Sequence, residues 1–509
     1  MRRILRGTAV LFLGAVLAGC PIGPGYQRPR MDVPDAWRAP SPSEDSLRGF
    51  YDSLATHRDT AGITRRDSTM PPGDSTLTSR PQPMLADSAA NLGWFELLQD
   101  TVLQRLVRTA VQDNRDVRAA IATIDEFRAQ YGIQRAALFP FVTANASGGT
   151  NKVVFAGNAP VAYDVWSATA NVSWELDFWG KLRRSTEAAR ADLIATEESR
   201  RAVVLSLVSD VAQAYLELRE LDLDLDISRR TLASRRETLR LAQRRFQQGL
   251  ISELDVRQFE AQVADPAVRV ADFERQIALK EDQLSILLGH QPADVPRGAT
   301  LADVLAPIAI PAAVPSTLLD RRPDVRQAEA QLHAATAPIA AAKAELLPRV
   351  MITGEWGSQA TRPSGLFKDN TGIYQLLGGI SIPIFAGGAL TSEIKVARAR
   401  AEQATNQYQQ TFLAALQEAQ DAFVSLRTSR DQLVAQQTQV TALRGALSLA
   451  TRRYDNGISS YLDVLDAQRS LFTAELALAQ VQRQELEAAV QLYKALGGGW
   501  SPDSSATPR

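Results

Sequence analysis

The residue types that carry out most protein chemistry are scarce in this sequence. It contains one cysteine and three histidines, and the histidines, His57, His290 and His333, lie far apart in the chain. Neither a disulfide framework nor a zinc ligand set can be assembled from so few groups. The sequence also has no phosphate-binding loop and no nucleophile elbow. We therefore expect no enzyme activity, no metal and no cofactor.

The charge balance argues against a nucleic-acid partner. The 509 residues include 56 Lys and Arg and 57 Asp and Glu, so the formal net charge is −1. Proteins that bind nucleic acid carry an excess of positive charge, which neutralises phosphates. This sequence has no such excess.

The single cysteine, Cys20, stands at the end of an export signal. A positive region with Arg2 and Arg3 precedes an apolar segment over residues 9–18, which ends in Leu-Ala-Gly-Cys. This ending resembles a bacterial lipobox, in which the chain is cut before the cysteine and acyl chains such as palmitate are attached to it. We expect a signal peptide over residues 1–19 and a lipid anchor at Cys20. An ordinary secretory signal with a chance cysteine is the alternative.

The chain between the anchor and the first periodic segment lacks a core of its own. Residues 20–38 are rich in Pro and Gly and are expected to lie extended. Residues 39–90 are rich in Ser, Thr, Asp, Arg and Pro without a helical or strand period, which predicts a flexible insert. No later stretch is apolar for the roughly 18 residues that a membrane helix needs. Any further membrane crossing must therefore use strands.

Most of the remaining sequence occurs twice. Residues 114–118 match residues 322–326, an offset of 208 (324 − 116), and the same offset holds without a gap to Asp255 and Asp463. We expect four parts: a first repeat over 91–291, a Pro-rich linker over 292–321, a second repeat over 322–496 and a C-terminal tail over 497–509.

Each repeat contains segments that alternate between apolar and polar residues. From residue 164 to 179 the even positions are mostly apolar and the odd positions polar, and the segment around 374–384 repeats this pattern, although Leu377 and Phe385 blur it. Shorter alternating segments lie near 142–147 and 349–356. Loops over 151–162 and 360–371 would join these four strands as two hairpins.

The apolar strand faces have no second sheet to cover them, which argues against a soluble sandwich. A lipid bilayer suits such faces, and there no sheet edge can stay unpaired. About eight strands are the minimum for a closed barrel, so four strands require several copies of the chain. Two, three or four copies remain possible on this argument.

A heptad pattern follows each strand pair. It runs from Val204 to Phe246 and again from Phe412 to Tyr454. The 66 steps from Gly180 to Phe246 correspond to about 100 Å of helix. The Leu-Asp alternation over residues 221–226 lies inside this helix, where we expect its aspartates to be solvated.

Each long helix should end at a glycine and turn into a return helix. Gly249 and Gly457 fit left-handed helix ends, and Ser252 and Ser460 fit N-caps of helices that reach about residues 288 and 496. The predicted unit is a long antiparallel coiled-coil hairpin. Two prolines, Pro266 and Pro338, should kink or interrupt their helices.

With these features the sequence resembles the TolC-like outer membrane factors, in particular the NodT-type efflux lipoproteins of resistance-nodulation-division pumps. The resemblance spans nearly the whole chain outside residues 39–90. The stretches that carry it are the lipobox followed by GPGYQRP, GWFELLQDTVLQRLV, VPSTLLDRRPDVRQAEAQL and RRYDNGISSYLDVLDAQRSLF.

The resemblance implies the outer membrane efflux protein fold: a homotrimer whose twelve β-strands form one barrel in the outer membrane, continuous with a periplasmic α-helical barrel of coiled-coil hairpins. Segments near 91–112 and 289–321 and the C-terminus would form an equatorial collar. The implied function is a passive, water-filled duct for multidrug export that docks on a periplasmic adaptor and an inner-membrane pump. An exit duct for type I protein secretion and a lipid-anchored periplasmic scaffold are the alternatives.

The family's tip motif, Arg-x-x-x-Gly-x-x-Ser, occurs once in each repeat and would dock the adaptor. Plain capping of a tight helix turn is the alternative for these residues. Asp455, beside the second tip, is a candidate for the periplasmic aperture, or a solvated turn residue. The motif falls on Arg245, Gly249 and Ser252, and on Arg453, Gly457 and Ser460.

Overall fold

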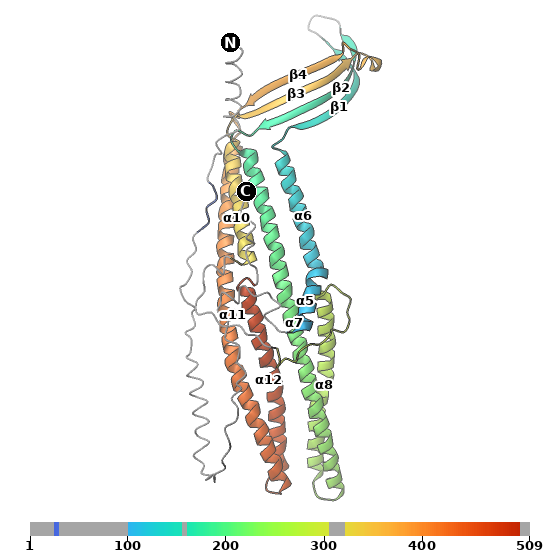
Figure 1. Cartoon of the computed structure of the whole chain (residues 1–509), viewed down its shortest axis with the longest axis vertical. Helices are drawn as coiled ribbons and strands as arrows, with labels where there is room; N and C mark the ends of the chain where they lie inside the picture. Colours follow the sequence, from blue (N-terminus) through green and yellow to red (C-terminus); the bar gives the residue numbers. More distant parts are fainter. Residues whose placement is uncertain (1–24, 30–99, 155–159, 305–320, 499–509) are drawn as a thin grey trace, which may run out of the picture. The chain divides into compact units, whose positions relative to one another are not determined.

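The computed structural model describes residues 25–29, 100–154, 160–304 and 321–498. Cys20, the signal segment, the 39–90 insert and the end of the tail lie outside these residues. The described chain falls into two units, which are treated separately: one combines residues up to 31 with 116–203 and 323–413, and the other combines 32–115 with 204–322 and 414 onward. Figure 1 labels the elements along the chain.

The elements occur in the order that the repeat predicts. The first half contains α5 (Thr101–Asp113), α6 (Arg115–Ala136), β1 (Phe141–Val153), β2 (Val161–Leu176), α7 (Lys181–Gln247) and α8 (Glu253–Leu287). The second half contains α10 (Pro323–Ala344), β3 (Arg349–Ala360), the short η1 (Pro363–Gly365), β4 (Gly372–Ser381), α11 (Ala389–Asp455) and α12 (Tyr461–Ala495). Helices α10, α11 and α12 begin and end 208 residues after α6, α7 and α8. The internal two-fold repeat is therefore confirmed at the level of single residues.

The first unit contains one antiparallel sheet with the order β1-β2-β3-β4 (Figure 1). The two expected hairpins are present, and β2 also pairs with β3 along eleven residues, from Trp166 opposite Ala360 to Leu176 opposite Val350. This pairing joins the two repeats, because a strand edge with free backbone groups readily accepts another strand.

The register places the apolar positions of all four strands on one face. Val172 lies opposite Val142 and Gly354, and Gly354 lies opposite Leu376. Much of this face is exposed in the single chain, and Tyr374 is 85% exposed. The opposite face carries mainly polar residues, because successive side chains of a strand point to opposite sides. The alternation expected from the sequence is confirmed.

Close packing explains one glycine on the apolar face. The ring of Trp166 lies against Gly148, the residue opposite it, and a Cβ atom at this position would stand 2.2 Å from the ring. Glycine thus leaves room for the tryptophan ring to lie flat on the neighbouring strand.

The long helices pair as antiparallel hairpins in the second unit. Lys280 of α8 contacts Glu217 of α7 at 2.6 Å, while Arg235, farther along α7, donates to the carbonyl of Gln262, earlier in α8, at 2.7 Å. α7 and α11 each have 67 residues, which corresponds to about 100 Å. Among the described helices none combines the length and apolar composition that crossing a membrane requires.

The structure corrects two points about these helices. Pro266 and Pro338 lie inside the helices α8 and α10, so neither proline interrupts its helix. Each proline removes only one backbone donor, and both helices are held by packing along their length. In the Leu-Asp run of α7, Asp226 is exposed as expected, but Asp224 is only 7% exposed.

Candidate functional site

The helix ends at the two hairpin turns follow from their glycines. Gly249 and Gly457 have φ angles of 73° and 71°, in the left-handed region that glycine enters without steric cost. The N–H of Leu250 then donates to the carbonyl of Arg245 at 2.9 Å, and the N–H of Ile458 donates to that of Arg453 at 2.8 Å. These bonds satisfy carbonyls that a helix end leaves free.

The return helices begin at the serines that the sequence identified. The Oγ of Ser252 accepts a hydrogen bond from the N–H of Asp255 at 3.2 Å, and the Asp255 carboxylate accepts one from the N–H of Ser252 at 2.9 Å. The Ser252 hydroxyl also donates to this carboxylate at 2.8 Å, and this bond, followed by the one from the Ser252 N–H, lowers the pKa of Asp255. The Oγ of Ser460 accepts from the N–H of Leu462 at 3.2 Å. The capping roles of both serines are confirmed.

The first tip contacts the second through Arg245. Its guanidinium donates a hydrogen bond to the phenol of Tyr454 and lies 5.4 Å from the centre of the Tyr454 ring. The Tyr454 ring contacts Tyr461 edge-on at 4.9 Å, and Tyr461 contacts Phe259 at 4.4 Å. Arg245 is thus half-buried and held in place by a chain of aromatic rings.

The other predicted tip residues are not part of this contact. Arg453 and Asp455 are exposed at the end of α11. The predicted glycines and serines shape the two turns and take no part in the side-chain contact between Arg245 and Tyr454. They are Gly249, Gly457, Ser252 and Ser460. The structure therefore separates one inward arginine, Arg245, from a second arginine that faces outward.

Sequence reasoning missed four apolar side chains on the tips. They occupy equivalent positions in the two repeats, 208 residues apart, and each is more than half exposed: Leu250 and Leu254 at 67%, Ile458 at 67% and Leu462 at 57%. Large apolar groups that gather on an exposed turn mark an interaction surface. The repeat alignment could have found them, because the same residue type recurs beside both Gly-x-x-Ser turns.

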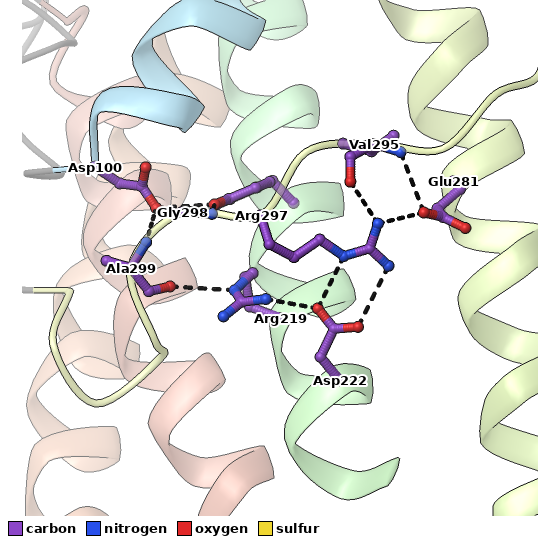
Figure 2. A network of polar contacts seen from close by, with 9 residues as sticks. Asp100, Arg219, Asp222, Glu281, Val295, Arg297, Gly298 and Ala299 are labelled. Carbon is purple, nitrogen blue, oxygen red and sulfur yellow. Dashed lines mark hydrogen bonds and ion pairs between the residues drawn. The ribbon is translucent and has the colours of Figure 1, made fainter. Parts of the chain in front are cut away.

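A polar network holds the segment that follows α8 against α5 and α7 (Figure 2). The phenol of Tyr215 donates to Asp100 at 2.9 Å and accepts from the N–H of Gly298 at 2.8 Å, and Asp100 also accepts from the N–H of Ala299 at 3.0 Å. Burial raises the pKa of Tyr215, and the Asp100 carboxylate raises it further. A Cβ at Gly298 would stand 2.2 Å from Asp100, so only glycine fits there.

Arginines complete the same network. Arg297 contacts Asp222 of α7 at 3.1 Å and also pairs with Glu281 of α8, as Figure 2 shows. Burial alone would lower the pKa of Arg297, but its hydrogen bonds to Asp222 and Glu281 raise it. Arg219 donates to the carbonyl of Ala299 at 3.1 Å. The described part of the linker is therefore tied to both helices of the first hairpin.

Two repeat-related side chains cap the return helices. The amide of Asn114 donates to the carbonyl of Leu287 at 2.9 Å, and the guanidinium of Arg322, 208 residues later, donates to the carbonyl of Ala495 at 3.1 Å. Arg322 also contacts Glu418 at 2.6 Å. The Arg-Arg-Pro-Asp stretch that supported the family resemblance thus has a structural role.

The described N-terminal residues lie along helices of the first unit. The ring of Tyr26 stacks on His333 at 4.9 Å, and Arg28 donates to the phenol of Tyr408 at 3.2 Å. His333 also lies 2.8 Å from Glu187. Burial raises the pKa of Glu187, but hydrogen bonds from His333 and Arg184 lower it by more. Residues 25–29 have no regular secondary structure and are held against these helices by their side chains.

Comparison with known proteins gives matches over most of the chain. The family model described as outer membrane efflux protein matches residues 106–290 and again residues 314–498. The probable efflux pump outer membrane protein TtgC of Pseudomonas putida is 37% identical over 420 residues, which cover 81% of this chain and 86% of TtgC.

Solved structures agree with this assignment. A membrane protein from Pseudomonas aeruginosa gives a TM-score of 0.81 at 30% identity, covering 94% of this chain and 100% of that chain. The open-state MtrE outer membrane channel of Neisseria gonorrhoeae gives 0.78 at 28% identity, covering 94% and 98%. The two family matches coincide with the two structural repeats, and the expected fold is confirmed. The chain belongs to the outer membrane efflux protein family.

Proposed function

We propose that three copies of this chain form a passive, water-filled exit duct, with the sheets closing one barrel in the outer membrane and the long hairpins extending into the periplasm. The observation that carries this proposal is the four-stranded sheet. Its apolar face is exposed, and within the described residues β1 and β4 each pair with only one strand. A sheet in lipid cannot leave these edges open, so further copies of the sheet must supply the missing strands.

The sheet also suits the lining of an aqueous passage. Its second face carries Thr143, Asn171, Ser173 and Glu355, and the register places them side by side on neighbouring strands. Twelve such strands would surround a polar lumen, as in other wide membrane barrels. Nothing in this lining supplies energy, so the driving force comes from a partner in the inner membrane.

The tips are the surface proposed for a periplasmic adaptor, through which the inner-membrane pump is reached. The exposed leucine and isoleucine side chains provide apolar contacts, Arg453 provides an outward charge, and the glycine turns hold both tips in the same shape. Acylated Cys20 would anchor the chain in outer-membrane lipid. Multiple acyl chains hold a protein firmly, since each buried CH₂ contributes about 0.8 kcal/mol.

The duct is tested on protein extracted from outer membranes. Unheated gel electrophoresis should show a trimer that dissociates on heating, and the same sample should conduct ions in planar bilayers. A monomer without conductance would contradict the duct and favour a lipid-anchored scaffold. A conducting trimer that supports protein secretion but not drug efflux in a deletion strain would favour the type I secretion pathway.

Adaptor docking needs a separate test. The sequence has one cysteine, Cys20, so Leu254→Cys introduces a thiol at the tip for crosslinking to the adaptor in cells. The matched control is Val268→Cys on the same helix, because Val268 is 69% exposed and lies away from the turn. Crosslinking at residue 254 and not at 268 supports docking at the tip, whereas the opposite pattern refutes it.

A further inference from the structure

A groove in the second unit is lined by residues of α7, α8 and α12. It has a volume of about 570 Å³, and its lining includes Asp224, Arg269, Phe273 and Phe472. Sites for small molecules commonly measure about 300–1,000 Å³ and combine apolar walls with a few polar groups. The groove falls within this range.

One carboxylate in this lining, that of Asp224, forms no ion pair within the described structure. Asp224 is only 7% exposed, and its Oδ1 atom is buried without a hydrogen bond. Glu220, one helical turn earlier, adds a like charge nearby. Burial, followed by the charge of Glu220, raises the pKa of Asp224 to about 7, and the positive charges of Arg269 and Arg483 oppose this rise only in part. A buried carboxylate is costly unless a cation or a donor compensates it.

The neighbouring acidic groups already have their own cations. Arg483 forms ion pairs with both Glu220 and Glu487, and Lys280 contacts Glu217 at 2.6 Å. On the other side of the groove, Asp265 lies 3.3 Å from the buried Arg235. Among these neighbouring carboxylates, Asp224 is therefore the one that forms no ion pair in the described structure.

We propose that this groove binds an amphiphilic organic cation, whose ammonium or guanidinium group pairs with the carboxylate of Asp224. The aromatic rings of Phe273 and Phe472 offer surfaces for an apolar body and for cation–π contact. Phe472 already makes such a contact, because the guanidinium of Arg235 lies 5.3 Å from the ring centre. A bare metal ion is disfavoured, since no metal-binding group of three or more acidic, His or Cys residues occurs among the described residues.

The groove lining contains two arginines, Arg269 and Arg469, of which Arg469 pairs with Asp466 at 2.7 Å. The charge of Arg269 lowers the pKa of Asp224, yet no ion pair joins these two side chains within the described structure. A bound cation must therefore overcome repulsion from Arg269. Replacement by neutral glutamine should strengthen cation binding, whereas the same change would weaken an anion held by this arginine.

The site occurs in one repeat only. The residues 208 positions after Glu220 and Asp224 are Thr428 and Gln432, which carry no charge. We therefore expect one cation per chain. This inference goes beyond the duct function and does not depend on it, since binding can be measured without a bilayer, adaptor or pump.

The test uses full-length protein in detergent and ethidium, an aromatic monocation whose fluorescence rises when it leaves water. Wild type should bind one ethidium per chain, Asp224→Asn should weaken binding at least tenfold, and Arg269→Gln should strengthen it severalfold. Binding should also weaken as the pH falls below about 7, where Asp224 takes up a proton. The control is Asp226→Asn, whose side chain is 62% exposed and paired with Arg230 at 3.0 Å.

The proposal is overturned if Asp224→Asn binds ethidium as wild type does, or if it loses no more affinity than Asp226→Asn. Weaker binding by Arg269→Gln, or displacement of ethidium by the anion 1-anilinonaphthalene-8-sulfonate, would also overturn it and indicate an anion site. Arg269→Gln keeps Asp224 in place, so it tests the proposal even if Asp224→Asn does not assemble.

Discussion

Arg245 of the first hairpin donates a hydrogen bond to the phenol of Tyr454 of the second hairpin, 209 residues later. The contact is not repeated by symmetry, because the residue equivalent to Tyr454 in the first repeat is Phe246 and the residue equivalent to Arg245 is Arg453. One charge-assisted bond thus joins the two tips of each chain. Such bonds contribute about 1.5–3 kcal/mol when one partner is charged.

Removal of this bond should loosen the tips. Tyr454→Phe deletes only the hydroxyl and keeps the ring beside Arg245, so we expect larger or more frequent openings in planar-bilayer recordings. Arg245→Ala removes the ring contact as well and should have the larger effect. Arg453→Ala is the control, because this exposed arginine takes no part in the contact. Unchanged conductance in both Tyr454→Phe and Arg245→Ala would show that the bond does not restrain the tips.

The glycines of the turns should resist substitution. Gly249→Ala and Gly457→Ala place a Cβ on backbone with φ above 70°, which costs about 1–2 kcal/mol for residues other than glycine. Both variants should unfold at lower temperature and crosslink less to the adaptor from residue 254. Gly445→Ala is the control, because Gly445 lies inside α11 with open space around its Cβ position and should gain about 0.5–1 kcal/mol. Equal stability of all three variants would contradict the assigned strain.

The hydroxyl of Tyr215 should be needed for stability. Tyr215 is fully buried, and Tyr215→Phe would leave the Gly298 N–H without its acceptor and remove one of the donors to the buried Asp100. An unsatisfied buried group costs about 1–3 kcal/mol, so the urea midpoint should fall accordingly. Tyr374→Phe on the exposed sheet face should leave it unchanged. A Tyr215→Phe midpoint equal to that of wild type would mean that water replaces the lost hydroxyl.

Periodicity predicted the regular elements of this fold well. The strand alternation appears in the register of Val142, Val172 and Leu376, and the heptads appear as two helices of 67 residues. These patterns are local, since each reflects which side of an element is apolar. Capping by Ser252 and Ser460 was predictable for the same reason.

Contacts between distant residues were not predictable in this way. No local pattern indicates that Arg245 meets Tyr454, that Tyr215 joins Asp100 to Gly298, or that β2 pairs with β3. Asp224 was expected to be solvated because it lies in a polar run, but α7 is covered along this side by other helices. Burial of one helix face depends on which elements pack against it, and the chain's own period does not specify them.

The raised pKa of Asp224 also makes the stability of the protein depend on pH. A carboxyl whose pKa is raised to about 7 in the folded protein, against about 3.9 unfolded, binds its proton more tightly when folded. Stability should therefore fall as the pH rises from about 4 to 7, by an amount on the order of a few kcal/mol, and stay low above pH 7. Asn cannot titrate, so Asp224→Asn should be more stable than wild type at pH 8, and this advantage should shrink toward pH 4.

Urea unfolding of both proteins between pH 4 and pH 8 measures this dependence. Asp226→Asn corrects for other titrating groups, because Asp226 lies on the same helix but is exposed. A constant difference between Asp224→Asn and wild type across the range would mean that Asp224 keeps an ordinary pKa. The stabilisation by a bound organic cation should also depend on pH, because the cation binds the folded state in which Asp224 is ionised. Adding ethidium should therefore stabilise wild type most at pH 8 and hardly at pH 5.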